Sequence, residues 1–269
     1  MSERRVALVT GASRGIGEAT ALAFASAGYD VAIAATNESA LQAVASKIRQ
    51  AGAKAAVFAG DLADLKFTQR FAAESAQMLG EPNVLVNNAA WRELVSMREI
   101  SLESWEKTLR ICLTAPAFLA RWVAQRMEPL RRGVIINVSS IMSSNAFGLA
   151  PAYIAAKGAM DALTYDLAAL YGPSSIRVLA INPGAIDTSL SSEMAQKDDE
   201  GADVRKFSEQ MISLGRWGSS EEIARTIVWL SSDDASYING TTIVADGGWS
   251  HQLYPLSIKN KMRPGQFPR

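Results

Sequence analysis

The chain has 269 residues, of which 48% are hydrophobic and 20% are charged, so it can bury a sizeable core and global disorder is not expected. Lysine plus arginine equals aspartate plus glutamate at 27 each, which argues against nucleic acid or an anionic membrane as the main partner. The single cysteine, Cys112, rules out an internal disulfide, and no apolar run approaches the roughly 20 residues of a membrane span, so we expect a cytoplasmic protein.

Short apolar runs alternate with helical patterns along most of the chain. The predicted strands are 6–10, 31–35, 55–59, 84–88, 134–138, 177–181 and 242–245. The predicted helices are 18–27, 67–79, 105–127, 152–171 and 221–230. A further helical pattern precedes Gly52 and ends there. Alternation of this kind predicts an α/β fold with a doubly wound, Rossmann-like parallel sheet and helices on both faces. We expect a single domain over residues 1–250.

Two regions break this alternation. Residues 187–217 contain the charged run "KDDEGADVRK" and no clear strand, and we expect them to form a lid. Residues 251–269 are rich in proline and basic residues and cannot extend the sheet. This C-terminal tail either reaches a neighbouring subunit or is disordered.

The segment "TGASRGIG" (10–17) follows the first strand and opens the first helix. Its glycines allow a tight turn and let the backbone approach a pyrophosphate, whose charge meets the amides and the dipole of the helix N-terminus. Ordinary turn chemistry is the alternative for glycines at such a place. Because the loop directly follows the first strand, the pattern favours dinucleotide binding.

The end of the second strand bears on the choice of dinucleotide. An acidic residue there would hold the ribose hydroxyls of NAD, but Thr36 and Asn37 occupy this corner. Arg14, inside the glycine loop, is placed to meet a phosphate. The sequence therefore favours NADP(H) over NAD(H).

Five motifs carry a resemblance to a known family. They are "TGASRGIG", "NNAA" (87–90), "NVSS" (137–140), "YIAAK" (153–157) and "NPGAIDT" (182–188). Their order and spacing resemble those of the short-chain dehydrogenase/reductase family, over about residues 5–249. Each motif is weak alone, and five in register are specific.

The resemblance implies that Ser140, Tyr153 and Lys157 form the catalytic set. A phenol is a poor base at neutral pH, but an ammonium one helical turn away and the positive charge of an oxidised nicotinamide favour the phenolate. Tyr153 would then protonate a carbonyl oxygen or deprotonate an alcohol. Lys157 would bind the nicotinamide ribose, and Ser140 the substrate oxygen. Taken singly, Tyr153 would be an ordinary helix aromatic, Lys157 a solvated charge and Ser140 a helix cap.

The same resemblance, with the glycine loop and the end of the second strand, gives the candidate cofactor-binding residues. Asp61 and Leu62 are expected at the adenine, Asn88 and Ala89 beside the adenosine, and the "NPGAIDT" segment at the nicotinamide carboxamide. The full set is Gly11, Ser13, Arg14, Gly15, Ile16, Gly17, Thr36, Asn37, Asp61, Leu62, Asn88, Ala89, Tyr153, Lys157, Pro183, Gly184, Ile186 and Thr188.

One position departs from the family pattern. Cys112 stands where members usually carry an asparagine that bends the helix and helps to hold a water beside the lysine. A thiol cannot replace an amide. Either the backbone carbonyl of residue 112 still holds the water, with Pro116 keeping the helix bent, or the relay is impaired.

The expected reaction is hydride transfer between NADP(H) and a small ketone or secondary alcohol. The alternatives are a 3-oxoacyl-carrier-protein reductase, with Arg131 and Arg132 near an acidic carrier, and a non-catalytic cofactor-binding regulator. Candidate substrate-pocket residues are Trp91, Met142 and Phe147. No metal site is expected.

Family members are commonly homotetramers, so the resemblance implies a homotetramer or homodimer. The two long helices, 105–127 and 152–171, would pack against their copies. The small side chains of Ala155, Ala156, Ala159 and Ala162 would let such helices approach closely.

Overall fold

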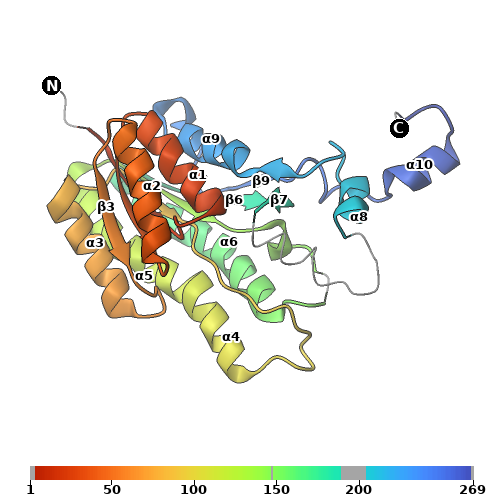
Figure 1. Ribbon diagram of the computed structural model, residues 1–269, viewed down its shortest axis with the longest axis horizontal. Helices are drawn as coiled ribbons and strands as arrows, with labels where there is room; N and C mark the ends of the chain where they lie inside the picture. The colour runs from red at the N-terminus through yellow and green to blue at the C-terminus, as the bar shows by residue number, and fades with distance from the viewer. Residues whose placement is uncertain (1–3, 147, 189–203, 268–269) are drawn as a thin grey trace.

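A doubly wound parallel sheet forms the centre of the computed structural model, which describes residues 4–146, 148–188 and 204–267 (Figure 1). Its seven strands lie in the order β3-β2-β1-β4-β5-β6-β9, and all neighbours are parallel. This confirms the predicted fold class. The strands are β1 (Val6–Thr10), β2 (Asp30–Ala35), β3 (Ala55–Ala59), β4 (Val84–Asn87), β5 (Gly133–Val138), β6 (Ile176–Pro183) and β9 (Thr242–Ala245).

Helices cover both faces of the sheet. One apolar core joins α1 (Gly15–Ser26), α2 (Glu38–Gln50) and α9 (Ser220–Leu230) to one face. A second core joins α3 (Leu65–Leu79), α5 (Ala115–Met127) and α6 (Pro151–Tyr171) to the other. Successive residues of β1 alternate between the two cores, since side chains of a strand point to opposite faces and both faces are buried here.

The long helix predicted over 105–127 is present but is interrupted. It begins as α4 (Leu102–Leu109), passes through a π-helical turn, Arg110–Thr114, and continues as α5. Pro116 lies two residues after the end of the turn and has no N–H to complete the ladder of hydrogen bonds, which explains a distortion at this place. The predicted bend is therefore a π turn, and Cys112 lies inside it.

One expectation about the outer surfaces needs correction. Ala156 is fully buried in a small apolar cluster, so it does not belong to the outward alanine face of α6, whereas Ala155 and Ala162 are exposed. The expected lid, 187–217, contains the helix α8 (Val204–Met211), and a short parallel pair of strands, β7 (Ile186–Asp187) and β8 (Gly218–Ser219), lies at its two ends. The rest of that expected lid, 189–203, lies outside the described residues.

The C-terminal tail contains one helix. α10 (Leu256–Met262) extends away from the sheet at the far right of Figure 1, and α8 is its neighbour. Short 3-10 turns complete the described elements: η2 (Glu128–Leu130), η3 (Ile141–Ser143), η4 (Gly172–Ser174) and η5 (Asp233–Ala235). Across the ranges that the structure describes, every helix is too short or too polar to cross a bilayer.

Candidate functional site

Tyr153 and Lys157 lie one turn apart near the start of α6, and their side chains meet. The Lys157 ammonium lies 5.4 Å from the centroid of the Tyr153 ring. The lysine side chain is only 2% exposed, and its Nζ donates a hydrogen bond to the carbonyl of Val138 at 2.6 Å. This bond fixes the lysine against the last residue of β5. The chain therefore holds a cation beside the phenol at the carboxyl edge of the sheet.

Ser140 lies two residues beyond β5, in the segment to which Lys157 is bonded. Its Oγ accepts a hydrogen bond from the Met142 amide at 3.1 Å and so caps η3. The preceding Ser139 donates to the Lys157 carbonyl at 3.2 Å. The structure thus brings the serine segment and the start of α6 together. Among the described residues, no hydrogen bond joins Ser140 to Tyr153, and the Ser140 hydroxyl keeps its own O–H to donate.

A buried amide network behind this site fixes the ends of β4 and β5. Asn87 Nδ2 donates to Asn137 Oδ1 at 2.9 Å, and Asn137 Nδ2 donates to Thr164 Oγ1 at 2.9 Å. The network ties both strands to α6, which carries Tyr153. Thr164 was not foreseen, because it lies seven residues beyond the "YIAAK" motif and only the fold brings it to Asn137.

The glycine loop is closely packed against the end of β4. A Cβ added to Gly17 would lie 2.2 Å from the Gly11 carbonyl oxygen and 2.5 Å from Asn88 Nδ2. Asn88 Nδ2 in turn donates to the carbonyls of Thr10 at 2.9 Å and Gly11 at 3.2 Å. Position 17 therefore requires glycine for steric reasons. Gly11 and Gly15 have φ values of +65° and +59°, which also favour glycine.

The N-terminus of α1 opens from this loop. Arg14 stands at the N-cap position and makes no side-chain capping hydrogen bond to the helix. Gly15 faces Thr188, whose Cγ2 would lie 3.3 Å from an added Cβ, so the segment after β6 closes one side of the loop. Ser13 and Ile16 are half-buried in the same turn. A side chain at these glycine positions would clash with the neighbouring residues, and the N-terminus of α1 has no side-chain cap. Both features fit the binding of a dinucleotide pyrophosphate at this loop.

The corner after β2 contains a cap of its own. Asn37 Oδ1 accepts hydrogen bonds from the Ala40 amide at 3.0 Å and from Ser39 Oγ at 2.9 Å, so this side chain caps α2. Thr36 is exposed beside it. The nearest following carboxylate belongs to Glu38, which lies beyond the cap in the first turn of α2.

The other expected cofactor residues divide into exposed and buried side chains. Asp61 is exposed and accepts from the Ala63 amide at 2.9 Å. Leu62 and Ile186 are 6% and 4% exposed and belong to the two cores, so the backbone is the part of each that can face a ligand. Gly184 closely approaches Asp246, because a Cβ there would lie 2.7 Å from the Asp246 Cβ. Pro183 ends β6, and Ala89 donates its amide to Thr10 Oγ1 at 3.1 Å.

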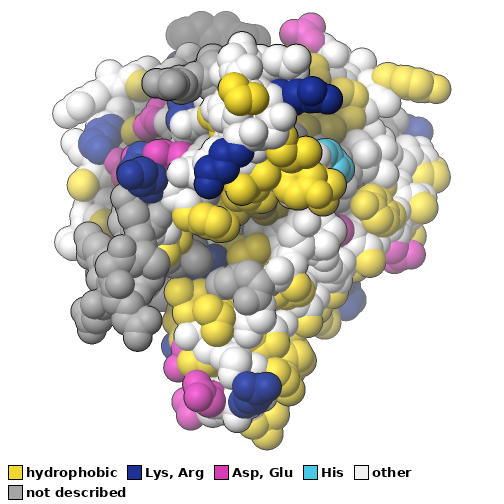
Figure 2. Space-filling model, turned by 90° about the vertical axis from the view of Figure 1, so that its right-hand side faces the viewer, with side chains coloured by type: hydrophobic (Ala, Val, Ile, Leu, Met, Phe, Trp, Pro, Cys, Tyr) yellow, Lys and Arg dark blue, Asp and Glu magenta, His cyan; other side chains and the backbone are white. Residues whose placement is uncertain are grey.

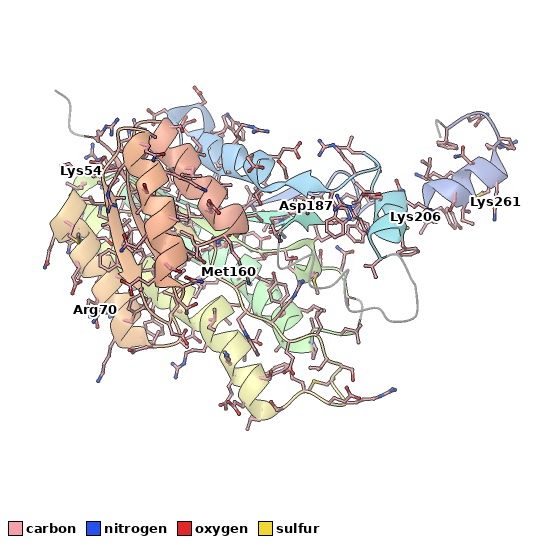
Figure 3. All side chains as sticks on the ribbon, in the orientation of Figure 1. Lys54, Arg70, Met160, Asp187, Lys206 and Lys261 are labelled. Carbon is pink, nitrogen blue, oxygen red and sulfur yellow. The ribbon has the colours of Figure 1, made fainter. Side chains whose placement is uncertain are left out.

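Asp187, labelled in Figure 3, lies at the end of β7 and pairs with Arg205 of α8 at 3.4 Å. Figure 2 looks onto the side of the molecule where α8 and α10 lie, and hydrophobic side chains gather near the middle of this face. Gln252 of the tail donates to the Gln210 carbonyl of α8 at 2.9 Å, so the end of β7 and the tail both contact α8.

The expected substrate-pocket residues have different surroundings. Trp91 and Met142 pack against the apolar cluster that contains Tyr153 and Cys112. The Lys107 ammonium of α4 also lies 4.3 Å from the centroid of the Trp91 ring. Much of this ring is therefore in contact with other side chains. Phe147 lies outside the described residues.

The structure adds Arg92, which the motifs did not single out. Its guanidinium carbon lies 5.4 Å from the centroid of the Tyr153 ring. The only available signal was an arginine directly after "NNAAW". Within the described ranges, no group of three or more His, Cys, Asp or Glu side chains forms a metal site.

Known proteins resemble this chain over nearly its whole length. A family model described as enoyl-(acyl carrier protein) reductase matches residues 11–250. An uncharacterized oxidoreductase from Thermotoga maritima is 35% identical over 94% of this chain and 98% of its own, and the D-threitol dehydrogenase of Mycolicibacterium smegmatis is 34% identical over 91% and 93%. The crystal structure of an acetoin dehydrogenase from Salmonella typhimurium superposes with a TM-score of 0.82 at 31% identity, over 98% of this chain and 99% of that one.

Proposed function

Because the chain belongs to the short-chain dehydrogenase/reductase family and is an oxidoreductase of alcohols and ketones, we propose that it transfers hydride between NADP(H) and a small secondary alcohol or ketone, with Tyr153 as the general acid and base. The observation that carries this proposal is the Tyr153–Lys157 pair, bonded to the end of β5 through the Val138 carbonyl. A nicotinamide cofactor is implied by the family. It supplies or accepts the hydride when bound.

The roles of the side chains follow from their chemistry. In the reducing direction Tyr153 gives its hydroxyl proton to the developing alkoxide, and in the oxidising direction the phenolate takes the proton of the alcohol. Lys157 places a buried ammonium beside the phenol that exchanges the proton. Ser140 directs its O–H at the substrate oxygen and so orients it.

Tyr153 must exchange its proton with solvent. Lys157 is almost fully buried, and its Nζ uses one of three N–H donors on Val138, so further donors can bind a water. Pro116 has no N–H for the carbonyl of Cys112 four residues before it. This carbonyl accepts from a water that joins Lys157 to solvent, and the thiol at position 112 does not stop turnover.

NADP(H) is the proposed partner in this reaction. Thr36 and Asn37 place no carboxylate directly after β2, and the Asn37 side chain caps α2. Arg14 lies exposed at the start of α1. A cation here and no repelling acid favour a phosphate on the adenosine ribose.

Residues 1–250 form the proposed catalytic unit, and residues 251–269 an arm for assembly into a homodimer or homotetramer. Phe118 of α5 is 38% exposed and pairs with the half-buried Trp122, with ring centroids 5.9 Å apart. Tyr165 and Leu170 of α6 are 47% and 61% exposed. Large apolar side chains on the outer faces of two long helices suit contact with the same helices of another copy.

A 3-oxoacyl-carrier-protein reductase is the second candidate, since the matching family model is described as a carrier-protein reductase. However, Arg131 donates to the Pro173 carbonyl at 2.9 Å and precedes β5. It therefore lies at the amino end of the strand, about 20 Å from the carboxyl edge that carries Ser140. These arginines do not support a carrier beside the site.

The experiment is a panel of small ketones, secondary alcohols and acyl thioesters, with NADPH, NADH and their oxidised forms, followed by the absorbance of the reduced nicotinamide. We expect turnover of ketones or alcohols with NADP(H). Preference for thioesters would favour the second candidate. Tight cofactor binding with no turnover would indicate a non-catalytic regulator.

A further inference from the structure

Arg92 brings a second cation to the proposed catalytic tyrosine. Its guanidinium carbon lies 5.4 Å from the Tyr153 ring centroid, and its Nη1 lies 3.9 Å from the sulfur of Met142. These contacts join the segment after β4 to η3 and to α6. The guanidinium therefore lies against Tyr153, between segments at the carboxyl edge of the sheet, where ligands of open α/β sheets bind.

The neighbours of Arg92 are both fixed to the helix that contains the π turn. Trp91 is bonded through its backbone to the thiol of Cys112, at 3.4 Å from N to Sγ and 3.3 Å from Sγ to O. On the other side, the Glu93 carboxylate accepts a hydrogen bond from Ser104 of α4. Because both neighbours are held toward this helix, the backbone of Arg92 has a defined position. Glu93 is directed at Ser104 and the guanidinium at Tyr153.

The surroundings of the guanidinium are largely apolar. Arg92 is half-buried, and the cluster beside it contains Ile111, Cys112, Ala150 and Tyr153, with Met142 packed against them. Charges attract more strongly in such surroundings than in water. A guanidinium also presents a planar fork of donors that matches a carboxylate with two parallel hydrogen bonds. Lys157, on the other side of this site, adds to the same positive field.

We propose that Arg92 binds a carboxylate of the substrate, so that the natural substrates are hydroxy or oxo carboxylic acids. This inference rests on the proposed function. The carbinol C–H passes as hydride to the oxidised nicotinamide, the O–H proton passes to Tyr153, and the carboxylate is unchanged. Since the guanidinium lies 5.4 Å from the Tyr153 ring, only a few carbon atoms separate the carboxylate from the reacting carbon.

The test compares acids with their neutral methyl esters. We use 3-oxobutanoate, 4-oxopentanoate and the two methyl esters, with NADPH, for the wild type and for Arg92→Gln, Arg92→Lys and Arg98→Gln. We expect the wild type to prefer each acid by about ten- to hundredfold in kcat/KM. Arg92→Gln removes this preference, because kcat/KM for the acids falls, mainly through KM, by much more than kcat/KM for the esters. Arg92→Lys retains part of it. Arg98, exposed on the same segment, is the matched control and keeps the preference.

Two results would overturn the inference. One is equal kcat/KM for acid and ester in the wild type. The other is an equal loss of both in Arg92→Gln with a shifted pH profile, which would mean that Arg92 acts on the ionisation of Tyr153. Calorimetry of 4-oxopentanoate binding to the enzyme with NADP⁺ separates this inference from the proposed function. Binding that is lost only in the Arg92 variants supports the carboxylate site even without turnover, and no binding by the wild type overturns it.

Discussion

The thiol of Cys112 is hydrogen-bonded to both backbone polar groups of Trp91. The Trp91 amide donates to Sγ at 3.4 Å, and the thiol donates to the Trp91 carbonyl at 3.3 Å. Burial raises the pKa of the Cys112 thiol, so it carries its proton at neutral pH and can donate. Position 112 therefore fixes the segment after β4, in addition to any part it has in the water path.

Cys112→Asn is expected to change kcat only a few-fold. The carbonyl of residue 112 is still without an N–H from Pro116, so the proposed water path from Lys157 to solvent is expected to be the same in both proteins. Steady-state rates across pH check this expectation. A gain of several hundredfold in the asparagine variant would show instead that the path is broken in the natural protein. Cys112→Ala, which removes the bonds to Trp91, is the companion variant, and it should raise KM more than it lowers kcat.

Thr36→Asp is expected to reverse the cofactor preference. A carboxylate directly after β2 repels the ribose phosphate of NADPH, and like charges in contact cost enough to lower kcat/KM about tenfold or more. NADH is expected to be used at least as well as before. Gln42→Glu adds the same charge further along α2, where Gln42 is exposed, and is the control. Unchanged discrimination in Thr36→Asp would refute the assignment of this corner.

Removal of residues 252–269 is expected to lower the mass of the assembly measured by light scattering. The arm exposes apolar side chains, among them Leu253 at 81% and Met262 at 64%, and a surface of this kind is stabilised by a protein partner. The full-length double variant Leu253→Ser with Met262→Ser should give the same lower mass. If both proteins keep the mass of the parent, the arm has no part in assembly.

The start of α9 makes stability depend on acid pH. The Arg216 side chain, together with the Ser219 amide, lowers the pKa of Glu222 from 4.5 to about 2. A carboxylate with a depressed pKa stabilises the fold fully above the unfolded value, and this contribution is lost as pH falls from 4.5 towards 2. We expect Glu222→Gln to lower stability at neutral pH and to reduce the loss of stability over this acid window.

Urea unfolding at neutral pH and at the acid end of the window measures this effect. Glu221→Gln is the matched control, because Glu221 lies in the same first turn of α9 but is exposed and does not form the capping box. An unchanged pH dependence in Glu222→Gln would contradict the assignment.

Most of the fold follows from patterns that are local in the sequence. The strands of this sheet are short apolar runs, and 6–10, 55–59 and 242–245 were predicted with the bounds that the structure gives. The start of the first helix was predicted three residues late, since Gly15 and Gly17 of the loop belong to α1. β7 and β8 have two residues each, too few to form a pattern.

The site could be predicted only where its residues share one element. Tyr153 and Lys157 lie on one helix, so their spacing predicted the contact. Arg92 and Tyr153 are brought together because α4 and the π turn pack against α6 and hold the segment after β4, and no periodicity encodes that contact. The capping role of Asn37 was also missed, because an asparagine before a helix has the same appearance whether it caps or binds a ligand.

The most direct measurement is turnover and cofactor affinity of Tyr153→Phe on the best substrate of the panel. We expect kcat to fall by at least about 10²- to 10⁴-fold, because proton transfer to the substrate oxygen is lost, while the calorimetric Kd for NADPH and the thermal stability stay close to those of the wild type. Turnover within a few-fold of the wild type would contradict the assignment of Tyr153 as the general acid and base.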